Sequence, residues 1–129
     1  MQVVDASAVL DLLLRTPRGE RVHALLDRDD VWAPQLVEVE VCSALARLER
    51  AGKVSPERLT RAYDSWRTFP YTAVSLSALR DRAWLLRDSV RVVDAFYVAA
   101  AVTLGAPLLT SDARLARSPV KGAAILLAQ

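Results

Sequence analysis

Apolar residues along the chain occur in two patterns, which predict two kinds of element. Short unbroken apolar runs predict buried strands, whereas longer stretches with apolar residues at every third or fourth position predict helices. Val37, Val41 and Leu45, for example, recur at helical spacing. The whole pattern predicts strands at residues 2–4, 31–33, 71–76, 107–110 and 123–127, and helices at 6–14, 18–29, 35–50, 56–67, 78–87 and 95–104.

Several residues mark where these helices begin and end. Ser55 followed by Pro56 is a strong helix start, because the serine hydroxyl can cap the helix and proline suits its first position. Gly52 supplies a stop for the helix before it. The stretch 95–104 is apolar on almost every face, so we expect this helix to be buried all round.

The order of these elements predicts the fold class. Short apolar strands that alternate with helices imply a parallel sheet covered by helices on both faces. A length of 129 residues fits one compact domain over residues 1–129, and a content of 53% apolar and 25% charged residues is too hydrophobic for a disordered chain. We therefore expect an α/β protein with three layers, α/β/α, around a short central parallel sheet.

Composition also bears on the setting of the protein. Cys42 is the only cysteine and cannot form an internal disulfide, which favours a reducing, cytoplasmic location. The chain opens directly on MQVVDAS, without the pattern of a signal peptide. The uncharged stretch that starts at Ala95 is broken by Gly105–Pro107 and is shorter than the ~20 apolar residues of a spanning helix. We expect a soluble protein with no membrane association.

The basic residues permit nucleic-acid binding without requiring it. The net charge is only +2, yet all 17 basic residues except Lys53 and Lys121 are arginine. Arginine binds phosphate groups through a planar fork of hydrogen-bond donors. A coding bias would also favour arginine, so this composition alone does not indicate a function.

Acidic residues that follow predicted strands are candidates for a functional site. Ligands of open parallel sheets bind at the carboxyl ends of the strands. Asp5 follows the first strand and Asp112 follows the strand that ends at Thr110. Asp94 is the only residue of the run 92–110 that is charged at neutral pH, and a buried carboxylate requires a partner. Each of the three could instead be a cap: Asp5 for a helix that begins at Ala6, Asp94 for one that begins at Ala95, and Asp112 for a turn that begins at Ala113.

A fourth acid could come from the predicted helix 35–50. Glu40 and Glu38 lie on opposite shoulders of its apolar stripe, and their spacing does not distinguish between them. No lysine or arginine adjoins Asp5 or Asp94, so acids that converged here would repel one another. A divalent cation would remove that repulsion, and a site made of carboxylate oxygens suits Mg²⁺ or Mn²⁺.

Three segments, taken in order, resemble one known family. VVDASAVLDLLL, APQLVEVEVCSAL and VVDAFYVAAAVTLGAPLLTSDARLA are similar to PIN-domain ribonucleases, specifically to the VapC-type toxins of prokaryotic toxin–antitoxin pairs. The similarity covers nearly the whole chain and implies a single PIN-like domain over residues 1–129. One departure is Cys42–Ser43, where many relatives carry an asparagine.

The resemblance implies which residues form the site. The family pattern matches Asp5, the glutamate followed by V-x-S-A-L, which is Glu40 rather than Glu38, the D-A-x-Y acid Asp94 and the T-x-D acid Asp112. Asp5, Asp94 and Asp112 would bind Mg²⁺ or Mn²⁺, with Glu40 acting mostly through water. Ser7 and Thr110 would orient carboxylates or substrate.

The resemblance also implies the reaction and the partners. The protein would be a metal-dependent endoribonuclease that hydrolyses RNA phosphodiester bonds and leaves a 5′-phosphate and a 3′-hydroxyl. Its partners would be a cognate antitoxin protein, whose basic side chain enters the acidic pocket, the RNA substrate and a second copy of the chain in a homodimer.

Two other functions are alternatives. A response-regulator receiver has about this length, but it requires paired acids after its first strand and a lysine near the last strands. A catalytically silent PIN domain would bind RNA or a protein without cleavage.

Among other residues, His23 is expected to have no catalytic role. Trp32, Trp66 and Trp84 are expected in the core or a subunit contact, and Arg15, Arg91 and Arg114 on the solvated surface.

Overall fold

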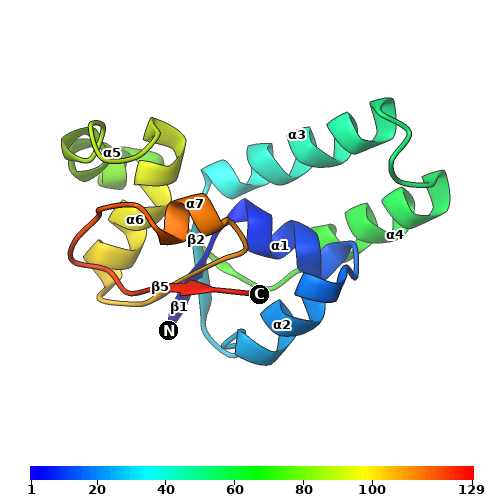
Figure 1. Cartoon of the computed structure of the whole chain (residues 1–129), viewed down its shortest axis with the longest axis horizontal. Coiled ribbons are helices and arrows are strands. Elements are labelled where there is room, and N and C mark those ends of the chain that lie inside the picture. Colours follow the sequence, from blue (N-terminus) through cyan, green and yellow to red (C-terminus); the bar gives the residue numbers. More distant parts are fainter.

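The computed structural model describes residues 1–129 and shows an α/β fold (Figure 1). Its strands are β1 (Gln2–Val4), β2 (Val31–Pro34), β3 (Thr72–Val74), β4 (Leu108–Thr110) and β5 (Ile125–Leu127). Its helices are α1 (Ala6–Leu13), α2 (Pro17–Leu25), α3 (Leu36–Arg50), α4 (Pro56–Arg67), α5 (Leu76–Leu85), α6 (Val92–Leu104) and α7 (Ala113–Ala116). None of the helices combines the length and the apolar character that crossing a bilayer requires.

The five strands form one parallel sheet in the order β3-β2-β1-β4-β5. The chain builds the sheet outward from β1 through β2 to β3, and then crosses back to place β4 on the other side of β1. The strand order therefore reverses between β1 and β4. In open α/β sheets, such a reversal leaves a crevice at the carboxyl ends of the two strands, where ligands bind.

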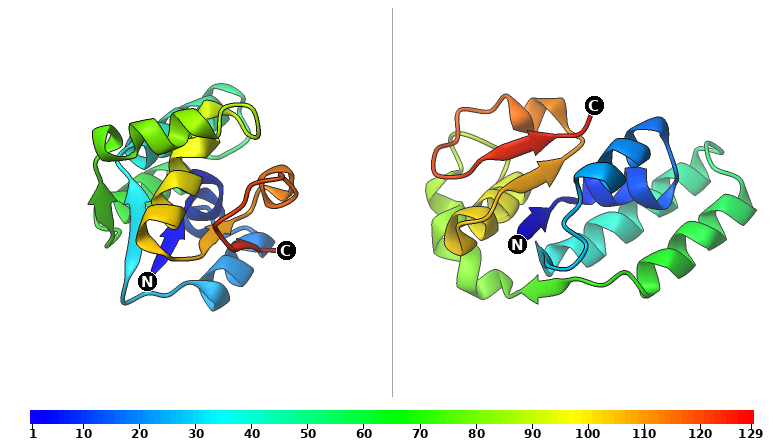
Figure 2. Two further views of the ribbon diagram at one scale, coloured as in Figure 1. Left: turned by 90° about the vertical axis from the view of Figure 1, so that its left-hand side faces the viewer. Right: turned by 90° about the horizontal axis from the view of Figure 1, so that it is seen from below.

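Helices cover both faces of the sheet, as the sequence predicts. Helices α5 and α6 lie on one side of the sheet in Figure 1, and α1 to α4 lie together on the other. Figure 2 shows the short strands enclosed between these groups, with β5 and α7 toward the C-terminal end. The three-layer α/β/α prediction is confirmed.

Helix α6 packs on the middle of the sheet, against β1, β2 and β4. Its buried positions are mostly small, including Ala95, Ala99 and Ala101, and short side chains allow the helix backbone to approach the strands closely. The prediction that this helix is buried is confirmed for its middle, whereas Val92 and Val93 in its first turn are exposed. Leu108 and Leu109 of β4 are fully buried on opposite faces of the sheet, and each stabilises the fold by roughly 1.5–3 kcal/mol.

Most element boundaries agree with the sequence pattern, and three differ. Helix α2 begins at Pro17, where the Gly19 N–H donates to the Thr16 hydroxyl, and it ends at Leu25, short of the predicted residue 29. Helix α5 begins at Leu76, two residues before its predicted start, and the strand before it is correspondingly short. Helix α6 begins at Val92, so Asp94 lies within its first turn rather than ahead of it.

The close approach of α1 and α2 depends on a glycine. A Cβ atom added at Gly19 would lie 2.2 Å from the backbone oxygen of Asp11, closer than any carbon–oxygen contact allows. Because this neighbour is backbone, it cannot turn away as a flexible side chain could.

We predict that Gly19→Ala destabilises the protein, because the two helices must separate to admit the methyl group. The expected loss in the free energy of unfolding is about 1–3 kcal/mol, as for other overpacked contacts. Urea unfolding measures it, with Arg18→Ala, an exposed position on the same helix, as the control that should change little. A Gly19→Ala protein as stable as the wild type would contradict the observed approach of the helices.

Candidate active site

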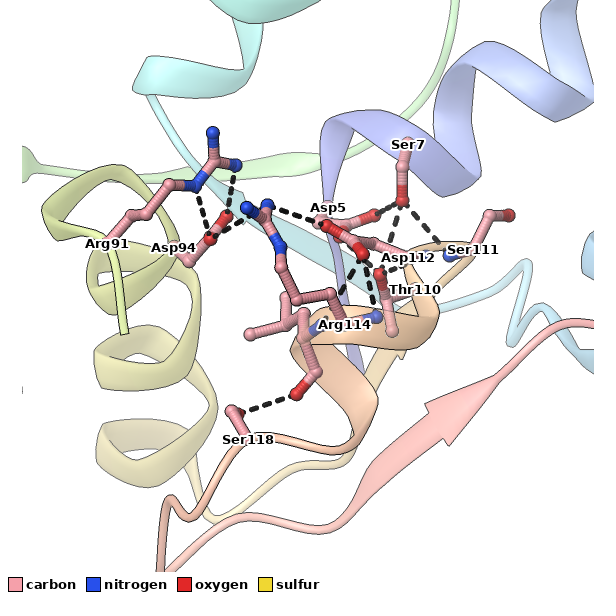
Figure 3. Close-up of polar contacts among 10 residues, drawn as sticks. Asp5, Ser7, Arg91, Asp94, Thr110, Ser111, Asp112, Arg114 and Ser118 are labelled. Atoms are coloured by element: carbon pink, nitrogen blue, oxygen red, sulfur yellow. Dashed lines mark hydrogen bonds and ion pairs between the residues drawn. The ribbon is translucent and has the colours of Figure 1, made fainter. Parts of the chain in front are cut away.

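Side chains from several elements meet at the carboxyl ends of β1 and β4 (Figure 3). Asp5 directly follows β1, and Thr110 is the last residue of β4. Asp112 stands just before α7, and Asp94 comes from the first turn of α6. The reversal of strand order thus brings together residues more than a hundred positions apart in the sequence.

The Asp5 carboxylate is buried and held by neutral donors. Its Oδ1 accepts hydrogen bonds from the Ser7 hydroxyl at 2.7 Å and from the Ala8 N–H at 3.0 Å. Its Oδ2 accepts from the Thr110 hydroxyl. Only 5% of the residue is exposed, and no lysine or arginine contacts it. Asp5 therefore caps α1, as one reading of the sequence predicts, but its negative charge has no cationic partner.

Burial makes this charge unfavourable. Removal from water is the main cause that raises the pKa of Asp5 to about 6, and the nearby charge of Asp112 adds to the rise. The hydrogen bonds from Thr110, Ala8 and Ser7 lower the pKa but offset only part of the effect. A positive charge placed beside Asp5 would favour its ionised form.

Two hydroxyl groups join Asp5 to the loop that carries Asp112. The oxygens of Ser7 and Thr110 lie 3.2 Å apart. Ser7 also accepts a hydrogen bond from the Ser111 N–H at 3.0 Å, and Thr110 accepts one from the Asp112 N–H at 2.9 Å. This network fixes the end of β1 against the end of β4.

Asp112 caps the short helix α7 and contacts an arginine. Its carboxylate accepts hydrogen bonds from the N–H groups of Arg114 and Leu115, at 2.9 and 3.4 Å. The Arg114 guanidinium lies 3.3 Å from the other oxygen. Burial by itself would raise the pKa of Asp112, but the side-chain and backbone hydrogen bonds of Arg114 outweigh it and lower the pKa.

Asp94 faces two arginines. The Nε and Nη2 atoms of Arg91 lie 3.0 and 3.3 Å from its two oxygens, forming a fork across one turn of the helix. Nη2 of Arg114 lies 3.9 Å from the same carboxylate. The interpretation of Asp94 as a helix cap is wrong, because two residues of helix precede it and its charge is met by guanidinium groups instead.

Glu40 lies on the sheet-facing shoulder of α3, near the buried Tyr97. Burial is the main cause that raises the pKa of the Tyr97 hydroxyl, followed by the proximity and negative charge of the Glu40 carboxylate and then by the charge of Asp5. The hydroxyl itself is buried without a hydrogen-bond partner. Asp94 is the main cause that raises the pKa of Arg91, and the charges of Asp112 and Glu40 add to it, so these three acids lie around Arg91.

The sequence analysis missed three neighbours of these acids. Arg91 and Arg114 were expected on the solvated surface, and instead both contact carboxylates at the site, although their side chains remain 60% and 61% exposed. The signal was present in the spacing, because residues three apart on a helix can form an ion pair, as Arg91 and Asp94 do. Tyr97 is the tyrosine of the D-A-x-Y motif, which was used only to identify Asp94.

The donor chemistry suits a divalent cation, although the carboxylates do not enclose one as they stand. No three Asp, Glu, His or Cys side chains converge on one point, and the Arg114 guanidinium lies between Asp94 and Asp112 (Figure 3). The available donors are carboxylate oxygens, which Mg²⁺ and Mn²⁺ prefer. The buried charge of Asp5, which no cationic side chain meets, is the observation that fits a bound cation.

Several known proteins are similar to this chain. The PIN domain family matches residues 3–121. Ribonuclease VapC3 of Mycobacterium tuberculosis is 46% identical over 117 residues, covering 90% of this chain and 85% of the relative. Ribonuclease VapC12 of the same species is 36% identical over 118 residues, covering 92% of each. A toxin–antitoxin complex from Klebsiella pneumoniae has a similar fold, with a TM-score of 0.70 and 13% identity over 100% of this chain and 98% of that one.

These similarities agree with the segments that first suggested the family. The match to the family covers β1 to α7 in order, including every element that carries an acid of the site. The strand order β3-β2-β1-β4-β5 is not that of a response-regulator receiver, so the receiver alternative is excluded. The chain therefore belongs to the PIN-domain family and, within it, to the VapC group.

Proposed function

We propose that this protein is a metal-dependent endoribonuclease and the toxin of a VapBC-type toxin–antitoxin pair, acting in the cytoplasm on RNA. The observation that carries the proposal is the gathering of Asp5, Glu40, Asp94 and Asp112 around the β1–β4 crevice. The relatives named VapC3 and VapC12 are ribonucleases, which supports the same reaction for this chain.

Each proposed site residue has a role that its surroundings support. Asp5, Asp94 and Asp112 would bind Mg²⁺ or Mn²⁺ directly. Glu40 would act mostly through a water molecule that it positions beside the metal. When bound, the metal would lower the pKa of a water and neutralise charge on the attacked phosphate. Ser7 and Thr110 hold the Asp5 carboxylate in one orientation, and such supporting hydrogen bonds strengthen metal ligands.

A catalytically silent PIN domain is the alternative, and the intact set of four acids does not favour it. Incubation of total cellular RNA with the purified protein distinguishes the two functions. The endoribonuclease cleaves with Mn²⁺ or Mg²⁺ and stops with EDTA, and mapping of the new ends identifies the substrate. A silent domain produces no metal-dependent cleavage.

We further propose an antitoxin as the protein partner, which the toxin–antitoxin complex of similar fold supports. A basic side chain of the antitoxin that entered the acidic site would meet Asp94 where Arg91 and Arg114 now contact it. If an Asp112→Asn variant bound the antitoxin as tightly as the wild type, the site would not be the point of inhibition.

We also propose a homodimer that forms through the α5–α6 face. Leu85, Trp84 and Val92 are 78%, 59% and 46% exposed there, an unusual amount of apolar surface to leave in water. Sedimentation equilibrium of the wild type and of Leu85→Glu tests this arrangement. A dimer that persists unchanged in the variant would place the contact elsewhere.

We predict that Asp94→Asn reduces RNA cleavage to background and leaves the fold intact. The amide has nearly the same shape as the carboxylate but is a poor ligand for a hard cation. Cleavage assays with Mn²⁺ measure the loss, and circular dichroism checks the fold. Asp81→Asn, whose carboxylate is 99% exposed on α5, is the matched control and should cleave normally. Full activity of Asp94→Asn would contradict the assignment of the site.

A second prediction concerns the buried charge of Asp5. Its folded-state pKa of about 6 lies above the usual value of 3.8, so the folded protein binds more protons than the unfolded chain between these values. Wild-type stability in EDTA should therefore fall as the pH rises through this window, by on the order of 1–3 kcal/mol. Asp5→Asn should lack this part of the pH dependence. Urea unfolding at about pH 4 and about pH 7 measures the difference between the two proteins.

Added Mn²⁺ should stabilise the wild type at neutral pH much more than it stabilises Asp5→Asn. An ion that binds only the folded protein stabilises it by about 2.7 kcal/mol at a hundredfold excess over Kd. The wild type and the Asp81→Asn control should both gain stability, whereas Asp5→Asn should gain little. Equal gains in all three proteins would show that the metal binds away from Asp5.

A further inference from the structure

A small pocket borders Asp94 on the side away from Asp5. It has a volume of about 110 Å³, and its polar lining comes from Arg91, Arg114, Ser89, Ser118 and Asp94 itself. Arg91 and Ser89 lie at the start of α6, whereas Arg114 and Ser118 belong to α7 and the residues after it. The pocket thus joins two elements that also carry acids of the proposed active site.

The two arginines of this pocket retain free hydrogen-bond donors. A guanidinium group carries five N–H donors. Arg91 uses Nε and Nη2 on Asp94 and leaves Nη1 without a contact. Arg114 contacts Asp112 and Asp94 through Nη2 alone, which leaves its Nε and Nη1 groups free. Figure 3 shows the two guanidinium groups beside each other over Asp94.

The charges of the pocket favour an anion once the carboxylates have another partner. Arg91 and Arg114 contact Asp94 and Asp112, which are also proposed cation ligands. A cation bound to these carboxylates would take over the neutralisation of their charge. Both guanidinium groups, more than half exposed, could then turn toward a ligand in the pocket.

We propose that Arg91 and Arg114 bind a backbone phosphate of the RNA, next to the phosphate that is cleaved. This inference rests on the proposed ribonuclease function and adds a substrate-binding subsite to it. A fork of parallel N–H donors matches phosphate oxygens, and the Ser89 hydroxyl provides a further donor at the pocket wall. The Ser118 hydroxyl already donates to the Leu115 carbonyl at 2.6 Å. The pocket has room for a phosphate group and not for a nucleoside, so it contacts the backbone without reading the base.

A purely structural role is the rival explanation for these arginines. In that case their function would be to neutralise Asp94 and Asp112 in the folded protein, without contact to RNA. An Asp94→Asn background separates the two roles for Arg91, because it removes the ion-pair partner of this arginine. For Arg114, whose nearer partner is Asp112, the background also carries Asp112→Asn. Both backgrounds should prevent cleavage during the binding measurement. In these backgrounds, any loss of RNA affinity on replacing an arginine reports contact with RNA.

The experiment measures binding of a fluorescein-labelled, random-sequence single-stranded RNA of about 12 nucleotides by fluorescence anisotropy. Arg91→Gln is added to Asp94→Asn, and Arg114→Gln is added to Asp94→Asn/Asp112→Asn. Each variant is compared with its own background in EDTA, from about 50 to about 200 mM NaCl. The control adds Arg61→Gln, an exposed arginine on α4, far from α7 in Figure 1. Circular dichroism confirms that each variant is folded.

Each pocket variant should bind the RNA several-fold more weakly than its own background. Its plot of log affinity against log salt concentration should be shallower by about 0.7, the value for one lost phosphate contact to a single strand. Arg114→Lys should keep the salt dependence, since its charge remains, and lose part of the affinity with the fork. The Arg61 control should match Asp94→Asn in both measurements.

Two results would overturn the subsite. Equal affinity and salt dependence in all variants would show that the arginines only neutralise carboxylates, and RNA cleavage by the wild type would leave the proposed function standing. Absence of RNA binding by Asp94→Asn at the lowest salt would also reject the subsite. If the wild type then also failed to cleave RNA with Mn²⁺, the proposed function would be wrong as well.

Discussion

The carboxylate of Asp5 lies at the reversal of strand order, where β1 and β4 end side by side, and its burial constrains the surrounding structure. Its hydrogen bonds to Ser7, Ala8 and Thr110 are satisfied, yet its charge has no cationic partner. A protein interior tolerates such a charge only at a cost in stability. The same donors that keep Asp5 in place tie the start of α1 to the loop after β4, so the arrangement also positions Asp112.

The remaining charges of the site are balanced differently. Asp94 and Asp112 are neutralised by Arg91 and Arg114, which reach them from flexible, largely exposed side chains. Asp94 itself is buried, but both guanidinium groups are more than half exposed and can turn into solvent when a cation replaces them. The site therefore combines one fixed, uncompensated carboxylate with two whose partners can leave. This combination suits a cation that binds reversibly and a polyanionic substrate that needs the arginines.

The fold provides the rigid support for these groups. The alanine-rich helix α6 packs closely on β1, β2 and β4, and it thereby brings Asp94 to the strand ends while its first turn stays at the surface. Helix α3 begins directly after β2 and carries Glu40 to the same region from the other side of β1. Both positions follow from the parallel sheet, because its strand ends all point to one edge.

Much of this protein could be predicted from its sequence, where the cause is local. Apolar periodicity predicted the three-layer fold, and Ser55 with Pro56 marked the start of α4, because caps and spacing act within a few residues. The acids after β1 and β4 were identified for the same reason, and motif resemblance selected Glu40. The arginine partners of Asp94 were not predicted, nor was the absence of a lysine or arginine side chain in contact with Asp5. These depend on which strands become neighbours and on where side chains more than a hundred residues apart meet, and only the tertiary structure decides that.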